Sequence, residues 1–267
     1  MKMKRKVITA LLAATMVASL AVGCGNKGGD SKSDSSKSSS SDEITIGFSQ
    51  VGAESDWRTA NSESMKSTFS EKNGYKLIFD DAQQKQENQI TAIRNFIQQD
   101  VDYIVLAPVT ETGWDTVLKE AKDADIPVII VDRMIDVSDD SLYTAWVGSN
   151  FKMEGQKACE WLNAYAEAKG MKEVNIAHIQ GTIGASAQIG RTEGLEEAAK
   201  EYGWNIVAQQ TGEFTQAKGQ EVMESMLKQH DNINVVYCEN DNEAFGAIDA
   251  IEAAGKTCLL YTSPSPR

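Results

Sequence analysis

The sequence predicts an α/β protein with two doubly wound parallel-sheet lobes joined by a hinge. From Glu43 onward, short apolar runs alternate with segments whose apolar residues recur every three or four positions. This is the pattern of strands alternating with helices. The apolar runs are nearly continuous, which is typical of parallel strands covered on both faces. The pattern extends beyond the usual size of one hydrophobic core, so we expect two lobes.

The first lobe is expected at residues 43–147. Right-handed crossovers between parallel strands then make the lobe doubly wound. Its strands are expected at residues 44–49, 75–79, 103–107 and 128–131, with helices after Arg58 and at residues 86–99 and 115–124.

The second lobe is expected at residues 148–256, with a hinge near Val147 to Asn150, where Gly148 and small polar residues permit bending. A run at residues 142–147 leads into it. Its helices are expected at residues 150–168, 191–202, 216–229 and 242–254, and its strands at residues 174–179, 205–210 and 235–237.

The stretch from Val51 to Arg58 stands between the first expected strand and the helix that follows. Such loops bind ligands in α/β sheets, because strand and helix hold them rigid while they stay exposed. Trp57 supplies a flat apolar ring, Arg58 a forked donor and Glu54 a carboxylate beside Ser55. These groups suit a polyhydroxylated ring with one apolar face. The alternative is that Trp57 packs the start of the helix onto the sheet.

Residues 1–23 have the features of a bacterial lipoprotein signal peptide. A basic start precedes an apolar run that is short for a transmembrane anchor, and small residues stand directly before Cys24. Cys24 would receive the lipid, the alternative being an ordinary secretory cleavage site. Residues 24–42 are rich in Ser, Lys, Asp and Gly and predict a disordered tether. We therefore expect a protein held outside the cell membrane by a lipid on Cys24.

The net charge of −13 argues against nucleic acid as a partner. Cys159, Cys238 and Cys258 have no C-x-x-C spacing, so they predict neither a metal site nor a complete disulfide framework. We interpret Cys159 and Cys238 as buried free thiols.

An enzyme is not expected, because the sequence contains no P-loop, dinucleotide-binding glycine fingerprint or nucleophile elbow. His178 lies inside an apolar strand and is interpreted as a core residue. Most carboxylates belong to helix faces and are interpreted as solvated. No cofactor and no metal ion are predicted.

Four motifs together resemble the periplasmic sugar-binding proteins of the ribose and galactose type. They are the Glu54-to-Arg58 loop, Asp132-Arg133 after the fourth strand, the stretch Gly181 to Arg191, and Asn240-Asp241. Residues 83–90 and 107–114 are similar, more closely, to the galactofuranose-binding members that serve ABC importers. The resemblance covers about residues 43–256. It departs at Asp56, where those members have glycine, and this leaves the sugar preference open.

The resemblance implies a type I periplasmic binding protein fold and assigns ligand contacts. Trp57 would stack on the sugar, the arginines would donate to its hydroxyls, and the carboxylates would accept from them. Asp132-Arg133 could instead be a surface ion pair, Arg191 could solvate its helix, and Asn240 could cap one. Phe214 would be a further wall of the site. The full predicted ligand-binding set is Glu54, Ser55, Asp56, Trp57, Arg58, Asp132, Arg133, Arg191 and Asn240.

The resemblance also implies the function, that of a monomeric, extracytoplasmic substrate-binding lipoprotein that delivers a monosaccharide to an ABC permease complex. Galactofuranose is the leading ligand, and another pentose or hexose is the first alternative. A second alternative is a sensing module that presents sugar to a membrane sensor kinase.

The tail at residues 257–267 matches no element of this fold. The family would continue after Lys256 with a strand and a further ligand loop. We therefore expect a non-native tail and an incomplete second lobe, the alternative being a naturally short protein.

Overall fold

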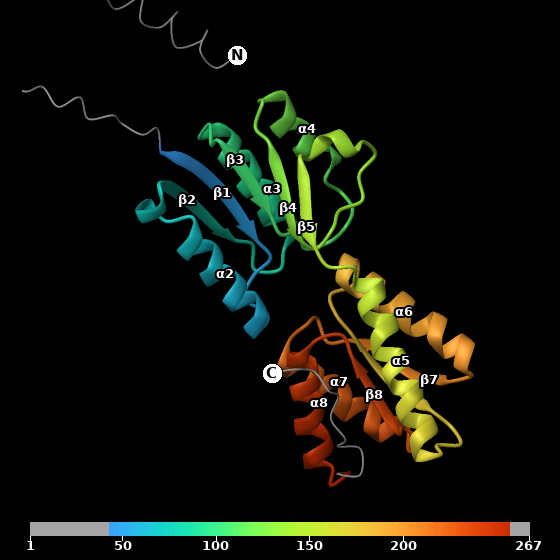
Figure 1. Ribbon diagram of the computed structural model, residues 1–267. Helices are drawn as coiled ribbons and strands as arrows, with labels where there is room; N and C mark the ends of the chain where they lie inside the picture. Colours follow the sequence, from blue (N-terminus) through green and yellow to red (C-terminus); the bar gives the residue numbers. More distant parts are fainter. Residues whose placement is uncertain (1–42, 257–267) are drawn as a thin grey trace, which may run out of the picture. The chain divides into compact units, whose positions relative to one another are not determined.

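The computed structural model describes residues 43–256, in which strands and helices alternate along the chain (Figure 1). The predicted signal peptide, Cys24, the tether and the tail at residues 257–267 lie outside the described residues. Within them two parallel sheets form, of five and three strands, which confirms the predicted fold class. We call residues 43–148 the first lobe and residues 149–256 the second lobe.

The first lobe contains a five-stranded sheet in the order β2-β1-β3-β4-β5, and all neighbouring strands are parallel. The strands are β1 (Ile44–Gln50), β2 (Tyr75–Asp81), β3 (Tyr103–Leu106), β4 (Val128–Asp132) and β5 (Ala145–Gly148). The helices are α2 (Asp56–Thr68), α3 (Gln86–Gln98) and α4 (Asp115–Asp123), with 3-10 turns at Glu71–Asn73 and Asp140–Leu142.

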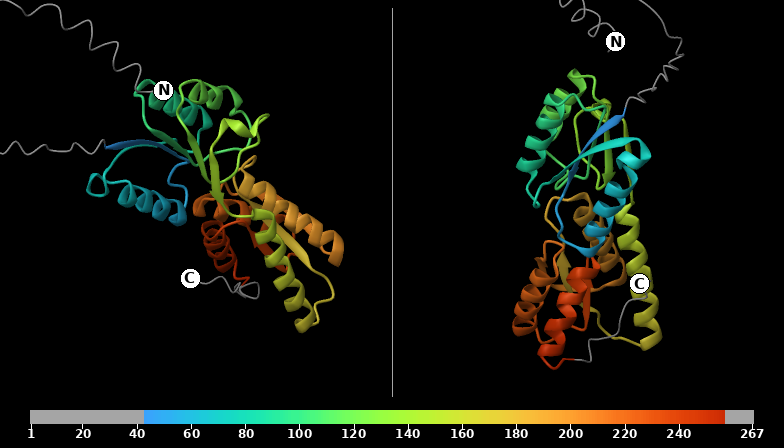
Figure 2. Two further views of the ribbon diagram at one scale, coloured as in Figure 1. Left: turned by 45° about the horizontal axis from the view of Figure 1, so that its top comes forward. Right: turned by 90° about the vertical axis from the view of Figure 1, so that its left-hand side faces the viewer.

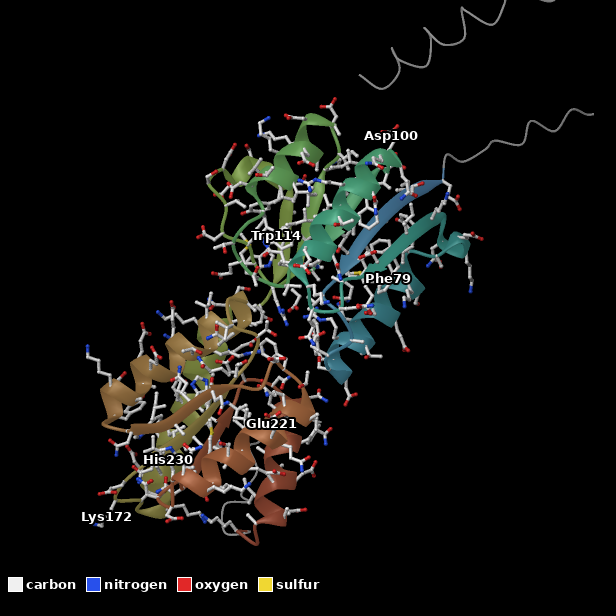
Figure 3. The ribbon with its side chains drawn as sticks, turned by 180° about the vertical axis from the view of Figure 1, so that it is seen from behind. Phe79, Asp100, Trp114, Lys172, Glu221 and His230 are labelled. Atoms are coloured by element: carbon white, nitrogen blue, oxygen red, sulfur yellow. The ribbon has the colours of Figure 1, made fainter. Side chains whose placement is uncertain are left out.

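Helices cover both faces of this sheet, as its nearly continuous apolar strands predicted (Figure 2). On one face, α3 and α4 pack over Ile104 and Ile130 around the fully buried Trp114. On the other face, α2 packs over Phe48 and Phe79, whose rings meet edge to face at 5.6 Å. Trp114 and Phe79 are labelled in Figure 3.

The second lobe contains a three-stranded parallel sheet in the order β7-β6-β8. Helices α5 and α6 pack on one face around Ile176, and α7 and α8 pack on the other around Ile179. The strands are β6 (Asn175–Gln180), β7 (Asn205–Thr211) and β8 (Val235–Cys238), and the helices are α5 (Phe151–Lys169), α6 (Ser186–Tyr202), α7 (Gln216–Gln229) and α8 (Asp241–Ala253).

Helix α6 begins five residues earlier than the sequence predicted, at Ser186 instead of Arg191. Gly190 and Gly194 lie within α6 at positions where it packs against α5. A Cβ on Gly190 would lie 2.8 Å from Lys152 N, and one on Gly194 would lie 2.9 Å from Gln156 N. Their absent side chains let α5 and α6 approach closely. The run at residues 142–147 also differs, because the strand there is β5, at residues 145–148.

Candidate functional site

The loop from Val51 to Arg58 lies at the carboxyl end of β1, before the first turn of α2. Ser55 caps α2, its side chain accepting a hydrogen bond from Arg58 N at 3.2 Å. Trp57 is 57% exposed, so it does not pack the start of α2 onto the sheet. One face of its ring lies against the Arg58 guanidinium, at 4.9 Å from the ring centroid. The aromatic ring of Trp57 is thus exposed to solvent on this loop.

Arg58 connects this loop to the end of β4 through two buried ion pairs. Its Nε donates to Glu54 Oε1 at 3.0 Å, and its Nη2 donates to Asp132 Oδ2 at 2.7 Å. The side chains of Arg58, Glu54 and Asp132 are 3%, 1% and 14% exposed. Residues 74 positions apart in sequence therefore meet at the carboxyl edge of the first sheet. Because these three charged side chains are buried and hydrogen-bonded to one another, their relative positions are fixed.

Arg133 extends the same cluster. Its Nη1 donates to the Val109 carbonyl at 3.1 Å, and its Nη2 lies 3.5 Å from Glu54 Oε1. Burial and the charge of Arg58 lower the pKa of Arg133 to about 10, although Glu54 and Asp132 act in the opposite direction. Arg133 therefore remains charged at neutral pH. Two arginines and two carboxylates, hereafter the arginine–carboxylate cluster, balance one another in formal charge.

Two atoms of the arginine–carboxylate cluster have unused hydrogen-bonding capacity. Glu54 Oε2 and Arg58 Nη1 are buried and have no hydrogen-bond partner among residues 43–256. Buried polar atoms are almost always paired in native proteins, so an unpaired acceptor and an unpaired donor in the same cluster call for a ligand or water. A hydroxyl group can donate to one and accept from the other.

In the second lobe, three predicted side chains are engaged with neighbouring protein groups. Arg191 pairs with Glu154 of α5 at 2.9 Å. Asn240 caps α8, accepting from Glu243 N at 2.8 Å and donating to the Phe214 carbonyl at 2.9 Å. Phe214 lies under the guanidinium of Arg133, at 4.9 Å. Their contact with a ligand stays a prediction, as does that of Asp56, which is exposed and whose N–H donates to Asn242 Oδ1.

Sequence reasoning missed two buried carboxylates, Glu239 and Glu243, which are 3% and 0% exposed. Glu239 accepts from His178 Nε2 at 3.1 Å, from Thr192 Oγ1 at 2.7 Å and from Gly181 N at 2.8 Å. His178 is a core residue as predicted. The apolar residues around Glu239, at the end of β8, were the signal that this carboxylate is not on a solvated face.

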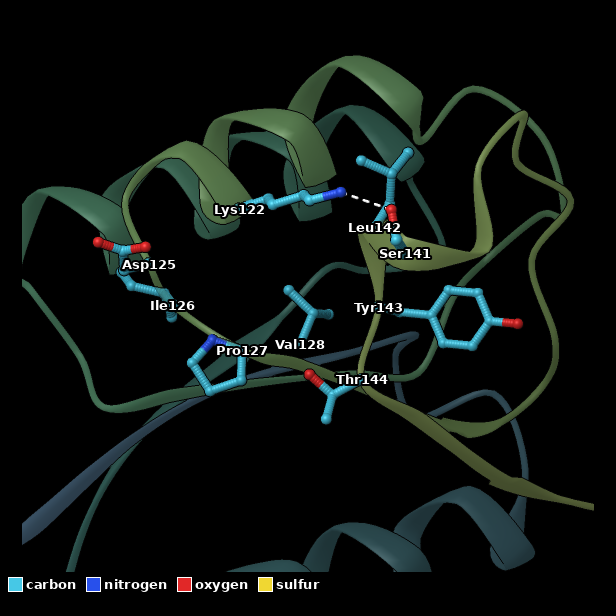
Figure 4. Close-up of a pocket in the computed structure, with 9 residues that line it drawn as sticks. All are labelled: Lys122, Asp125, Ile126, Pro127, Val128, Ser141, Leu142, Tyr143 and Thr144. Carbon is cyan, nitrogen blue, oxygen red and sulfur yellow. Dashed lines mark hydrogen bonds between the residues drawn. The ribbon is translucent and has the colours of Figure 1, made fainter.

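Two pockets open on the described part of the chain. One, of about 250 Å³, opens at the amino end of β4 beside Pro127 and Tyr143, with Lys122 bonded to Ser141 above it (Figure 4). The other, of about 430 Å³, is lined by residues at the starts of α5 and α6, by Trp146 of β5, and by Glu111 and Met134 of the first lobe, Met134 being the residue after Arg133. Ligands of parallel sheets bind at the carboxyl ends of strands, so the first pocket lies at the wrong end.

Within residues 43–256, no group of His, Cys, Asp and Glu side chains could hold a metal ion. In the same range, no helix is long and apolar enough to cross a membrane. Cys159 and Cys238 are free thiols, Cys159 being buried and Cys238 half-buried, and burial raises the pKa of Cys159 to about 12.

The periplasmic binding protein domain family matches residues 46–262. This chain belongs to that family. The chain is 50% identical over 216 residues to the galactofuranose-binding protein YtfQ of Escherichia coli (strain K12), an alignment that covers 79% of this chain and spans 67% of that relative. Family membership confirms the predicted fold type and the prediction of a binding protein instead of an enzyme.

Two solved structures of similar proteins contain furanose sugars. One is the binding protein of the arabinose ABC transporter of Shewanella sp. ANA-3 with α- and β-L-arabinofuranose, 51% identical with a TM-score of 0.75 over 79% of this chain and 70% of that one. The other, from Mycobacterium smegmatis with β-D-fucofuranose, is 49% identical with a TM-score of 0.76 over 79% of this chain and 69% of that one.

Proposed function

We propose that this protein binds a monosaccharide in its furanose form and delivers it to an ABC importer, with galactofuranose as the leading ligand. The observation that carries the proposal is the unpaired acceptor and donor, Glu54 Oε2 and Arg58 Nη1, in the buried arginine–carboxylate cluster. A neutral sugar satisfies both atoms through its hydroxyls without adding a charge. The furanose ligands of the two similar structures support the ring form.

Binding is proposed to use the sequence-predicted residues in two ways. Glu54, Arg58 and Asp132, with Arg133, form hydrogen bonds to ring hydroxyls, while the exposed ring of Trp57 stacks on the apolar face of the sugar. Phe214 belongs to the second lobe, and its ring contacts and supports the guanidinium of Arg133. Sugar bound between two lobes stabilises their closed arrangement, which the permease then recognises.

Titration calorimetry with locked ring forms tests the ligand. Methyl β-D-galactofuranoside is expected to bind, and methyl β-D-galactopyranoside to bind at least about tenfold more weakly. In samples shown by circular dichroism to be folded, Arg58→Met should abolish most of the binding, whereas Arg94→Met, which removes an exposed arginine paired with Glu120, should not. Equal affinity for both glycosides would contradict the furanose assignment. Loss of affinity in both variants would contradict the assigned site.

Attachment is proposed to occur through lipid on Cys24, as the small residues before it suggest. A single lipidated cysteine carries the attachment, so Cys24→Ser should move the protein from the membrane fraction to the medium or periplasm. Equal membrane retention of both forms would contradict it. Permease and ATPase genes beside this gene would support delivery to an importer, and a histidine kinase gene would support the sensing alternative.

A further inference from the structure

Phe214 has an unusual backbone conformation in the loop between β7 and α7. Its φ is 62°, and that of the preceding Glu213 is 57°, a left-handed region that bulky residues rarely adopt. Its ring is buried, at 3% exposure, and faces the guanidinium of Arg133. Such a conformation persists only where the surrounding groups hold it.

Two side chains at the start of α8 hold the Phe214 backbone. The Phe214 N–H donates to Glu243 Oε1 at 2.9 Å, and its carbonyl accepts from Asn240 Nδ2 at 2.9 Å. On the ring side, a Cβ on Gly181 would lie 1.9 Å from Phe214 Cζ, so the ring occupies the space left by this glycine. The main chain of Phe214 is thus fixed by side chains that are distant in sequence.

Glu243 is suited to this task because it is a fully buried acceptor. It is 0% exposed, and its Oε2 has no partner within the described part of the chain. Burial, together with the charge of Glu239, raises the pKa of Glu243 to about 8, against the lowering effect of the Phe214 N–H. Glu243 therefore keeps its proton at neutral pH.

The groups that pack near Glu243 would not compensate a negative charge on its carboxylate. Glu239 and Cys238 both lie at the end of β8, and Glu239 is itself paired with His178. The loop and α7 contribute glycines, Gly212 and Gly219, whose added Cβ atoms would come within 2.9 Å and 2.8 Å of Glu243. A charged carboxylate would therefore be poorly compensated here, whereas a neutral one fits.

We propose that Glu243 is a positioning residue of the sugar site, whose side chain fixes Phe214 and, through the ring of Phe214, the guanidinium of Arg133. The effect on sugar affinity rests on the proposed function, because Arg133 is assigned there as a sugar contact. The effect on the Phe214 backbone does not rest on the proposed function. An apolar residue at 243 would leave the Phe214 N–H without an acceptor, while glutamine would supply one.

Hydrogen–deuterium exchange and calorimetry on three variants test the inference. Glu243→Leu removes the acceptor, Glu243→Gln retains a neutral one, and Glu252→Leu removes an exposed carboxylate from the same helix as a control. In Glu243→Leu, the Phe214 amide should exchange at least about tenfold faster, and the Kd for methyl β-D-galactofuranoside should rise about tenfold. Both quantities should stay within about twofold of wild type in the other two variants.

A pH profile separates positioning from a purely structural role. Above pH 8 the wild-type protein carries an uncompensated buried charge that Glu243→Gln lacks, so wild-type sugar affinity should fall relative to that of Glu243→Gln between pH 7 and 9. Unchanged amide exchange in Glu243→Leu would overturn the inference, as would faster exchange with unchanged affinity. If the wild-type protein binds no sugar, the proposed function fails, and the exchange rates alone still decide whether Glu243 fixes Phe214.

Discussion

Replacing Arg58 with methionine should destabilise the fold strongly, independently of any ligand. The guanidinium is 3% exposed and pairs with Glu54 and Asp132 at 3.0 and 2.7 Å. Removing one partner of a buried ion pair costs about 3–5 kcal/mol, because the remaining charge stays buried without compensation. Here two carboxylates lose the same partner and retain only Arg133 nearby. Such a loss is a large part of the stability of a typical domain, which is about 5–15 kcal/mol.

Urea unfolding followed by circular dichroism measures this loss. With an m-value of about 2 kcal/mol/M, the midpoint should fall by about 1.5–2.5 M. Arg94→Met is the matched control, because the Arg94–Glu120 pair is 48% and 39% exposed and should contribute at most about 1 kcal/mol.

A double-mutant cycle isolates the pair itself. In Arg58→Met with Glu54→Gln, one of the two buried carboxylate charges left by the first change is removed, so the double variant should lose less than the sum of the single losses. Equal midpoints for Arg58→Met and Arg94→Met would refute the conclusion that burial makes the Arg58 ion pairs important for stability. Strict additivity in the cycle would refute the conclusion that Arg58 and Glu54 interact.

Three further predictions concern one residue each. Trp57→Ala should change the unfolding free energy by no more than about 0.5 kcal/mol, since the ring is 57% exposed, yet raise the sugar Kd about tenfold in calorimetry. Between pH 4.5 and about 8, folded Glu243 keeps a proton that the unfolded chain has lost. Wild-type stability should therefore fall with rising pH by up to about 1.4 kcal/mol per unit more steeply than that of Glu243→Gln. Gly194→Ala should cost about 1–3 kcal/mol, despite the better helix propensity of alanine, because it forces α5 and α6 apart.

A specific result would contradict each of these three predictions. Unchanged sugar affinity in a folded Trp57→Ala variant would mean that the ring makes no stacking contact. Parallel declines of the urea midpoint from pH 5 to 8 in wild type and Glu243→Gln would mean that Glu243 is ionised throughout. A melting temperature for Gly194→Ala equal to that of Glu196→Ala, an exposed change on the same helix, would mean that the helices are not in close contact there.

The sequence determined the type and order of the elements, because periodicity is a local property. Most strand and helix boundaries lie within two residues of those predicted. The largest exception, the start of α6, arose where a residue packs against a segment distant in sequence. The helix was predicted to begin at Arg191, yet Gly190 lies inside α6, where α5 approaches it at a distance that excludes a Cβ. Helix packing of this kind leaves no periodic signal.

The sequence also placed the predicted ligand residues of the first lobe at the carboxyl edge of the first sheet, since the loop after β1 and the residues ending β4 follow parallel strands. The pairing within the arginine–carboxylate cluster was decided by tertiary structure alone. Arg58 and Asp132 meet only because β1, β3 and β4 lie side by side. The unpaired Glu54 Oε2 and Arg58 Nη1 follow from that geometry, because burial removes water as the alternative partner.

In the second lobe, tertiary structure decided which polar groups are buried. The sequence predicted solvated carboxylates on helix faces, but Glu243 is buried, and the missing side chain of Gly212 leaves room for its carboxylate. The cap role of Asn240 was foreseen as one of two possibilities, while its bond to Phe214 was not. Burial and charge compensation depend on neighbours brought together by the fold, and a linear pattern does not contain those neighbours.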